Sequence, residues 1–234
     1  MSRRLASVTL DNLDDLPRRC RRCVRWELDP VARERAEAAG DPALEKEAWV
    51  SAVLLEWGSC GKIAYVDAAP AGFVLYAPPA HVPRSVAFPT SPVSADAVLL
   101  MTAVVRPEFA GGGIGRMLVQ GVAKDLTRRG VKAIEAFGDA KAGRDPLDDT
   151  DLDDTDDSNR RARPGSGPAG EPASRCLVPA DYLLAVGFKT VRPHHRFPRL
   201  RLELKNALSW REDVEVALER LLGSMNPDPA LRPV

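Results

Sequence analysis

The sequence lacks an excess of charge of either sign, a long apolar run and a cysteine-rich framework. Its 33 Lys and Arg residues balance 33 Asp and Glu residues. It therefore has no general electrostatic attraction to nucleic acid or to an anionic membrane. Residues 97–105, its longest nearly apolar run, contain Thr102 and are far shorter than the roughly 20 residues that cross a bilayer. We expect neither a nucleic-acid partner nor a membrane partner.

Two further scarcities concern the location of the protein. Four cysteines among 234 residues are too few for a disulfide scaffold, and no apolar segment follows the first arginines as it would in a secretory signal. We therefore expect a cytoplasmic protein. Arg far outnumbers Lys, and Ala, Gly and Pro are abundant, which hints at a GC-rich bacterial genome. The 44 % of hydrophobic residues is ordinary for a globular protein with a core.

One segment differs in composition from the rest. Residues 141–175 contain hardly any aliphatic side chain, and eight of the residues in 145–157 are Asp. Such a stretch buries too little apolar area to offset the entropy of ordering it. We interpret it as a disordered insertion within a single domain made of residues 1–140 and 176–222, followed by a flexible tail at 223–234.

The remaining patterns predict an α/β fold. Strands are expected at residues 5–10, 62–68, 72–77, 97–105, 131–137, 188–191 and 200–204, and helices at 42–57, 114–129, 179–186 and 209–222. The link at residues 69–71 is short enough for an antiparallel hairpin. The strand, helix and strand between residues 97 and 137 imply a parallel pair in a mixed sheet.

The sharpest motif is a glycine cluster between a strand and a helix. Gly111, Gly112, Gly113 and Gly115 lie where the helix with Ile114 on its apolar face begins. Glycines allow a close approach of the backbone, and the first amides of the helix are unpaired, so the segment suits a phosphate group. It matches neither the GxGxxG dinucleotide pattern nor the P-loop. The alternative is a glycine-rich turn without a ligand.

The segment from Val105 to Leu118 resembles the acetyl-CoA-binding motif of the GNAT N-acetyltransferase superfamily. Val105 and Pro107 fit its V-x-P element, and Gly113 and Gly115 supply its two glycines, whereas Ala110 stands where Gln or Arg is usual. Residues 183–188, LLAVGF, are similar to the helix-to-strand junction that follows this motif. The resemblance implies a mixed, mostly antiparallel sheet with a splayed parallel strand pair, flanked by helices.

The resemblance also implies an activity. Acetyl-CoA would be the cosubstrate, no metal would be required, and a primary amine on a small molecule or peptide would attack directly in a ternary complex. A backbone amide near Ala103 or Val105 would polarise the thioester carbonyl. The residues expected to bind acetyl-CoA are Ala103, Val104, Val105, Gly111, Gly112, Gly113, Ile114, Gly115 and Arg116.

The proton-transfer residues are the next question. The family's usual acid is a Tyr four residues before the Gly of the GF pair, where this chain has Leu183. Tyr182, one residue earlier, is the candidate acid on the condition that the helix register differs from the family's; the alternative is a core or surface tyrosine. Glu135 is the candidate base, because burial in an apolar strand raises a carboxyl pKa; alternatively it faces solvent. Other candidates are Asp96, Asp139, Glu27, His194 and His195.

Two other function classes remain open. The departures at Leu183 and Ala110 also fit a module that binds acyl-CoA without turnover. Cys20 and Cys23 form a CxxC beside arginines, which suits a zinc or redox protein, although the other two cysteines lack ligand spacing and the glycine loop is then unexplained.

Overall fold

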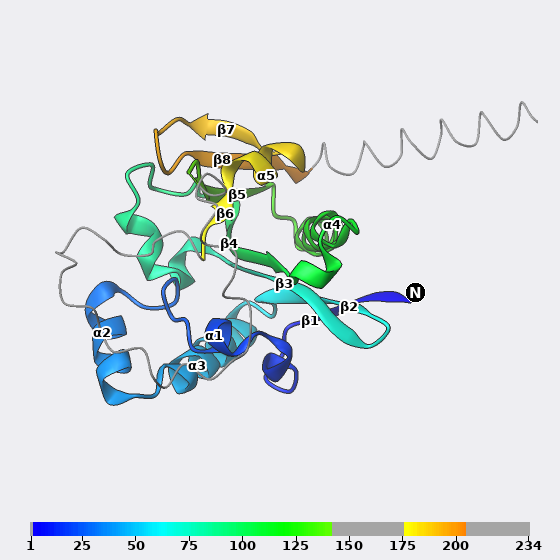
Figure 1. Ribbon diagram of the computed structural model, residues 1–234. Helices are drawn as coiled ribbons and strands as arrows, with labels where there is room; N and C mark the ends of the chain where they lie inside the picture. Colours follow the sequence, from blue (N-terminus) through cyan, green and yellow to red (C-terminus); the bar gives the residue numbers. More distant parts are fainter. Residues whose placement is uncertain (1, 142–175, 205–234) are drawn as a thin grey trace, which may run out of the picture.

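The computed structural model describes residues 2–141 and 176–204. Its centre is an eight-stranded mixed sheet in the order β1-β2-β3-β4-β5-β8-β7, with β6 beside β5 (Figure 1). The strands are β1 Arg3–Ser7, β2 Gly61–Val66, β3 Ala69–Ala77, β4 Ala97–Val105, β5 Ala133–Asp139, β6 Val178–Pro179, β7 Lys189–Arg192 and β8 Arg199–Glu203. The α-helices are α1 Arg18–Arg21, α2 Pro30–Ala39, α3 Pro42–Glu56, α4 Ile114–Arg128 and α5 Ala180–Ala185.

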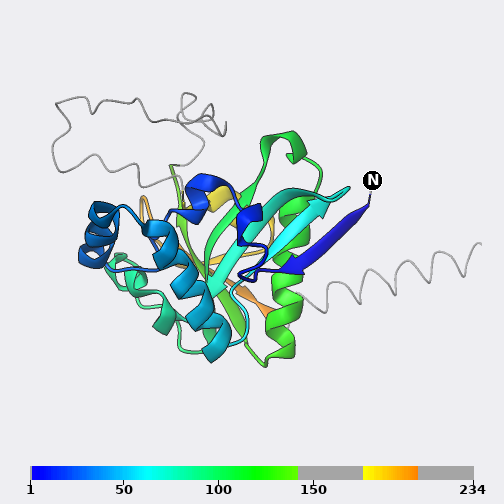
Figure 2. The same ribbon diagram turned by 90° about the horizontal axis from the view of Figure 1, so that it is seen from below.

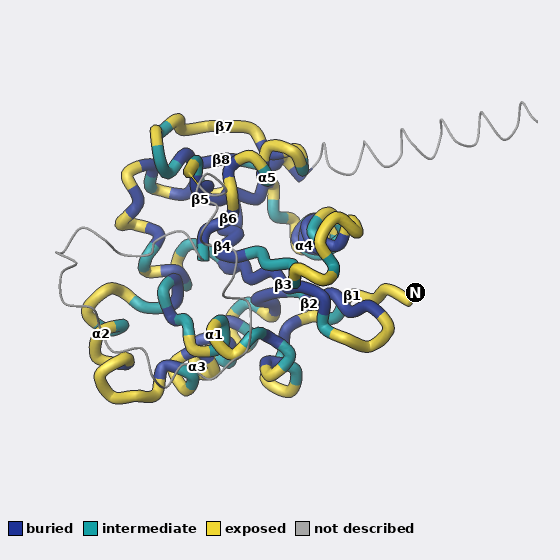
Figure 3. Tube along the Cα trace, in the orientation of Figure 1, coloured by how far each residue is buried: buried dark blue, intermediate teal, exposed yellow. Residues whose placement is uncertain are grey.

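Helices cover both faces of the sheet, and each face has its own apolar core. Val50 and Val53 of α3 pack against one face together with N-terminal residues. Leu118 and Val122 of α4 pack against the other, which α5 also covers. Figure 2 shows α3 and α4 on opposite sides of the strands, and Figure 3 shows buried residues concentrated in the central strands. The predicted α/β class and mixed, mostly antiparallel sheet are confirmed.

The two long N-terminal helices start at Asp-Pro pairs. The Asp29 carboxylate accepts hydrogen bonds from the amides of Val31 and Ala32, and Asp41 accepts one from Leu44. The proline after each cap fixes a helical φ where no amide donor is needed. The helix predicted at residues 42–57 is confirmed to within one residue. The helix α2, by contrast, was not among the predicted elements.

The hairpin between β2 and β3 is confirmed, but its turn is not at the predicted link. The turn residues are Asp67 and Ala68, with φ of 47° and 70°, and residues 69–71 belong to β3. Two residues of positive φ match the twist of the paired strands. The register shift between Ala64 and Tyr65 absorbs one extra residue of β3 as a bulge.

The first strand also differs from its prediction. It comprises Arg3–Ser7 rather than residues 5–10, and it pairs with β2 from Arg3 opposite Val66 to Ser7 opposite Lys62. An edge strand accommodates arginines because one face and one edge meet solvent. The predicted helix at 209–222, the tail at 223–234 and nearly all of the insertion at 141–175 lie outside the described residues. Among the described residues, no helix has the length and apolarity to cross a membrane.

The parallel unit is confirmed, and its two strands separate early. Strands β4 and β5 pair only from Ala97 opposite Ala133 to Leu99 opposite Glu135. Beyond Leu99, β4 continues along β3 as far as Val105. Strands that diverge in this way leave hydrogen-bonding groups of β4 facing the gap rather than a neighbouring strand.

Replacing Ala68 with Gly is expected to stabilise the protein. Ala68 holds a φ of 70°, a conformation that costs a residue with a Cβ roughly 1 kcal/mol and glycine little. We expect the free energy of unfolding in urea to rise by about 0.5 to 1 kcal/mol. The control is Ala48→Gly on the exposed side of α3, which should lower it by about 1 kcal/mol. A loss of stability in both variants would contradict the prediction.

Candidate functional site

The glycine loop opens α4 with unpaired backbone amides. Gly113 caps the helix at a φ of 77°, and Gly111 has a φ of 73°. The amide of Met117 donates to the carbonyl of Gly113 at 3.0 Å, so the helix leaves the amides of Ile114, Gly115 and Arg116 without backbone acceptors. Together with the helix dipole, these donors form a site for an anionic group.

The loop is open on its outer side and anchored on its inner side. A Cβ added to Gly111 or Gly113 would meet no atom within 4 Å. Inside, Ile114 is buried in the core with α4, and Arg3 of β1 donates from Nη1 to the carbonyl of Gly112 at 2.9 Å. The backbone conformation is therefore held from within while its exposed side stays accessible.

The strand that leads into the loop presents a free edge. In β4, Leu100 pairs with Tyr76 and Thr102 pairs with Leu75, so Met101 is an extra residue that bulges. Bulges terminate pairing and turn side chains at functional sites. Within the described residues no strand pairs with the half-buried Ala103–Val105 segment on the side that faces β5. An extended ligand with amide groups suits such an edge.

The short strand β6 lies between β4 and β5 at this gap (Figure 1). Val178 pairs with Gly138 of β5. Two residues earlier, the carbonyl of Cys176 accepts a hydrogen bond of 3.0 Å from Thr102 Oγ1 of β4. Residues 176–179 therefore bridge β4 at Thr102 and β5 at Gly138, and they leave the edge of β4 beyond Thr102 free.

Tyr182 reaches the glycine loop from α5. A Cβ added to Gly115 would lie 2.5 Å from Tyr182 Oη, so the phenol touches the start of α4. Oη is inaccessible to solvent and has no hydrogen-bond partner among the described residues. Burial raises the pKa of Tyr182, and Arg116 opposes that rise. Leu183, at the position of the usual family acid, is wholly buried in the core.

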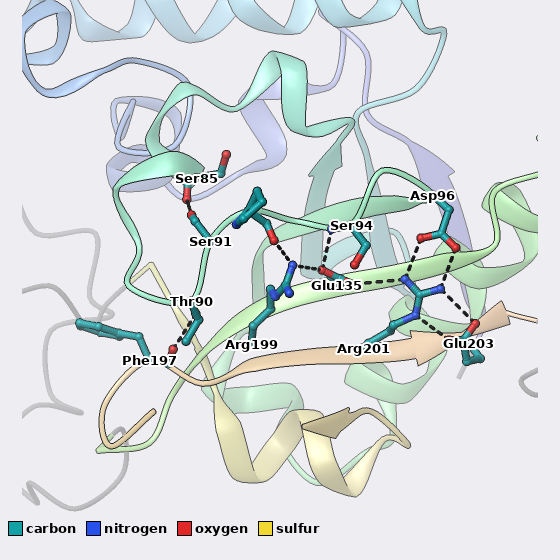
Figure 4. A network of polar contacts seen from close by, with 11 residues as sticks. Ser85, Thr90, Ser91, Ser94, Asp96, Glu135, Phe197, Arg199, Arg201 and Glu203 are labelled. Atoms are coloured by element: carbon teal, nitrogen blue, oxygen red, sulfur yellow. Dashed lines mark hydrogen bonds and ion pairs between the residues drawn. The ribbon is translucent and has the colours of Figure 1, made fainter. Parts of the chain in front are cut away.

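Glu135 lies at the paired end of β4 and β5, away from the glycine loop. Its Oε2 accepts hydrogen bonds from Arg199 Nη1 at 2.9 Å and from the amide of Ser94 at 3.1 Å. Its Oε1 accepts one from Arg201 Nη1 at 3.2 Å. Figure 4 shows this carboxylate between the two arginines of β8. The side chain is fully buried, so it does not face solvent, and its oxygens are already engaged.

The ion cluster extends to the surface through Arg201. Arg201 contacts both oxygens of Asp96, at 2.9 and 3.0 Å, and also Glu203. These contacts hold the pKa of Asp96 below its usual value and raise that of Arg201. The two arginines are two positions apart on β8, a spacing that brings both to the same face. That spacing is a sequence signal that places both arginines on one face of β8, but it does not identify Glu135 as their partner.

The other candidate residues lie in separate local contacts. Glu27 and Lys46 form a buried ion pair. Asp139 accepts a hydrogen bond from the amide of Lys141 at 2.9 Å. His194 Nδ1 accepts from the amides of Arg196 and Phe197, so it stabilises the bend before β8. The structure brings none of these residues to the glycine loop.

The cysteines are arranged differently from the CxxC that the sequence suggests. Cys23 Sγ lies 3.2 Å from the Sγ of Cys176, a residue 153 positions away. No group of three or more His, Cys, Asp or Glu side chains is arranged to hold a metal ion in the part of the chain that the structure describes.

Comparisons with known proteins identify the family. Residues 20–144, more than half of the chain, match the model of the acetyltransferase (GNAT) family. The PaiA N-acetyltransferase of Thermoplasma acidophilum, solved with coenzyme A, has a TM-score of 0.50 at 11 % identity, covering 87 % of this chain and 99 % of that one. An N-acetyltransferase of Staphylococcus aureus Mu50 has a TM-score of 0.49 at 12 % identity, with coverages of 87 % and 99 %. No curated protein matches the sequence.

We expect Glu135→Gln to destabilise the fold. The neutral amide would leave the buried Arg199 without its anion and remove one of the three carboxylates around Arg201, and breaking a buried ion pair costs about 3 to 5 kcal/mol. Urea unfolding measures the change. The control is Glu203→Gln, which contacts the same Arg201 but is half-exposed and should change stability by no more than about 1 kcal/mol. Equal effects in both variants would contradict a structural role for Glu135.

Proposed function

This chain belongs to the GNAT acetyltransferase family, and on that premise we propose that it transfers the acetyl group of acetyl-CoA to a primary amine by direct attack in a ternary complex. The observation that carries the proposal is the free edge of β4 running into the open glycine loop. An extended strand edge followed by unpaired helix amides suits a ligand that has a peptide-like arm and a pyrophosphate.

The residues present fit acetyl-CoA. The amides of Ile114, Gly115 and Arg116 would hold the pyrophosphate, and the open side of Gly111 and Gly113 leaves room for it. The edge at Ala103–Val105 would bind the pantetheine arm. When bound, acetyl-CoA supplies an activated thioester. Ala110 offers no side-chain contact, but the backbone donors do not depend on it.

The chain's own groups would assist the transfer in two ways. A β4 amide near Ala103 or Val105 would stabilise the charge that develops on the carbonyl oxygen. Tyr182 Oη would give its proton to the departing sulfur. Burial raises the pKa of this phenol, so the proton remains on Oη throughout the neutral range and Tyr182 can act as a general acid. Arg116 beside it moderates the rise.

Glu135 is assigned a positioning role in this proposal instead of the role of base. Its oxygens accept hydrogen bonds from two arginines and a backbone amide, which occupy the lone pairs that a base would use. The same contacts fix β5 and β8 where β4 begins to diverge. Glu135 would therefore support the shape of the gap without touching the reacting atoms.

The acceptor would approach on the face of the sheet that the N-terminal helices cover. A shallow pocket beside Val104 is lined there by Asp15, Phe73 and Arg106, among others. Asp15 contributes a carboxylate and Arg106 a guanidinium to this pocket, so it would present polar groups of both signs to an amine on a small molecule or a peptide. Because Val104 lies on the free segment of β4, an amine in this pocket would be next to the proposed thioester position.

Replacing Gly113 with Val is expected to weaken acetyl-CoA binding. A β-branched residue disfavours the φ of 77° and places methyl groups on the open side of the loop. We expect at least a tenfold rise in the dissociation constant measured by isothermal titration. The control is Gly130→Val, at the other end of α4, where φ is 75° and the space is equally open. If both variants bind equally well, the loop is not the binding site.

Removing the Tyr182 hydroxyl is expected to lower turnover with little change in binding. Tyr182→Phe keeps the ring against Gly115 and removes only the hydroxyl group with its proton, so kcat should fall about 100-fold while acetyl-CoA affinity stays within about twofold. For the wild type, the raised pKa predicts that kcat loses no activity to deprotonation of this acid below about pH 10. An unchanged kcat in Tyr182→Phe would remove Tyr182 from the mechanism.

A further inference from the structure

Two thiols from distant parts of the sequence meet beside the gap between β4 and β5. Cys23 follows α1, Cys176 precedes β6, and their sulfur atoms are 3.2 Å apart. A disulfide needs about 2.05 Å, so closing the bond requires the two sulfur atoms to approach by roughly 1.2 Å. Both residues are partly exposed, and a small oxidant can therefore reach them.

The environment makes Cys23 the more nucleophilic of the two. A hydrogen bond between the two sulfur atoms, followed by a backbone hydrogen bond at Arg25 and the charge of Lys46, lowers the pKa of Cys23 to about 6 against burial and the charge of Glu27. The same hydrogen bond and burial raise the pKa of Cys176. These shifts favour a thiolate at Cys23 and a thiol at Cys176, the arrangement that reacts with peroxides.

The remaining cysteines do not share these properties. Burial raises the pKa of Cys20, and Cys60 is fully buried with its pKa raised to about 12. The partner of Cys23 is thus Cys176 and not the other member of the CxxC.

We propose that Cys23 and Cys176 form a redox modification site at which a hydroperoxide produces a reversible intramolecular disulfide. The Cys23 thiolate attacks the peroxide, an S–O bond forms and the O–O bond breaks, which gives a sulfenic acid and an alkoxide (hydroxide, for hydrogen peroxide). The alkoxide takes a proton from solvent and leaves as the alcohol (or water). The sulfur of Cys176 then attacks the sulfur of Cys23. The S–S bond forms, the S–O bond breaks, and the hydroxyl leaves as water with the proton of Cys176. A dithiol reverses the change and is itself oxidised.

The disulfide would join two layers of the fold at the proposed acyl-transfer site. The carbonyl of Cys176 accepts hydrogen bonds from Thr102 Oγ1 of β4 and from Trp26 Nε1, at 3.0 and 3.4 Å. A bond to Cys23 would therefore tie the N-terminal segment to β6 in the gap. The chemistry of the pair does not depend on acyl transfer, so the test below stands apart from the proposed function.

The experiment uses the full chain, reduced and then treated with one equivalent of hydrogen peroxide at pH 7. We expect free thiols to fall from four to two per chain and to return to four with dithiothreitol. Trypsin cuts between Cys20 and Cys23, so the products can be distinguished. The expected product is residues 23–25 linked to residues 176–189, in a protein of monomer mass.

The matched control is Cys20→Ser, which should fall from three thiols to one and give the same linked peptide. Cys176→Ser should give no linked peptide and leave a sulfenic acid at Cys23 that dimedone captures. Cys23→Ser should likewise give no disulfide-linked peptide. A link between Cys20 and Cys23, a covalent dimer, or four thiols remaining after peroxide would overturn the proposal. Because Cys20→Ser leaves both proposed partners in place, a folding defect in the other variants would not prevent this test.

Discussion

The early separation of β4 from β5 is the constraint on which the rest of the site depends. The two strands share only three residue pairs, ending at Leu99 opposite Glu135, and the bulge at Met101 follows at once. Had the pairing continued, the amides and carbonyls of Ala103–Val105 that face β5 would be hydrogen-bonded to that strand. Because the pairing stops, this part of β4 is hydrogen-bonded to β3 on one edge and has the other edge free. The free edge leads directly into the glycine loop.

A separation of this kind must be stabilised at the point where it begins. Glu135 stabilises the structure there, because its carboxylate binds Arg199 and Arg201 of β8 and the amide of Ser94 before β4. A buried charge is costly unless it is paired and hydrogen-bonded. Here both oxygens have partners, and Arg201 also forms an ion pair with Asp96 near the surface. The Glu135 carboxylate therefore connects β5, β8 and the segment before β4 at the end of the gap where β4 and β5 are still paired.

Local patterns predicted the elements that carry the motif, and tertiary contacts decided the roles of side chains. The alternation and apolar run of β4, the spacing of Ile114 and Leu118 in α4, and the glycines between them are all local signals. The environment of Glu135 depends on arginines 64 and 66 residues away, which no local pattern ties to it. The turn at Asp67 and Ala68 was missed because alanine rarely adopts a positive φ.

The position of Tyr182 shows how the loop and the candidate acid depend on each other. Leu183 occupies the core, and this choice of helix register turns the preceding tyrosine toward the start of α4. Tyr182 can come that close only because residue 115 has no side chain, since a Cβ there would lie 2.5 Å from Oη. Gly113 is needed for its left-handed backbone and Gly115 for the approach of a phenol. The glycine cluster thus satisfies two separate requirements: it exposes amides for an anionic ligand, and it admits the only tyrosine placed against them among the described residues. Binding of the donor and protonation of its leaving group would then depend on the same five residues of backbone.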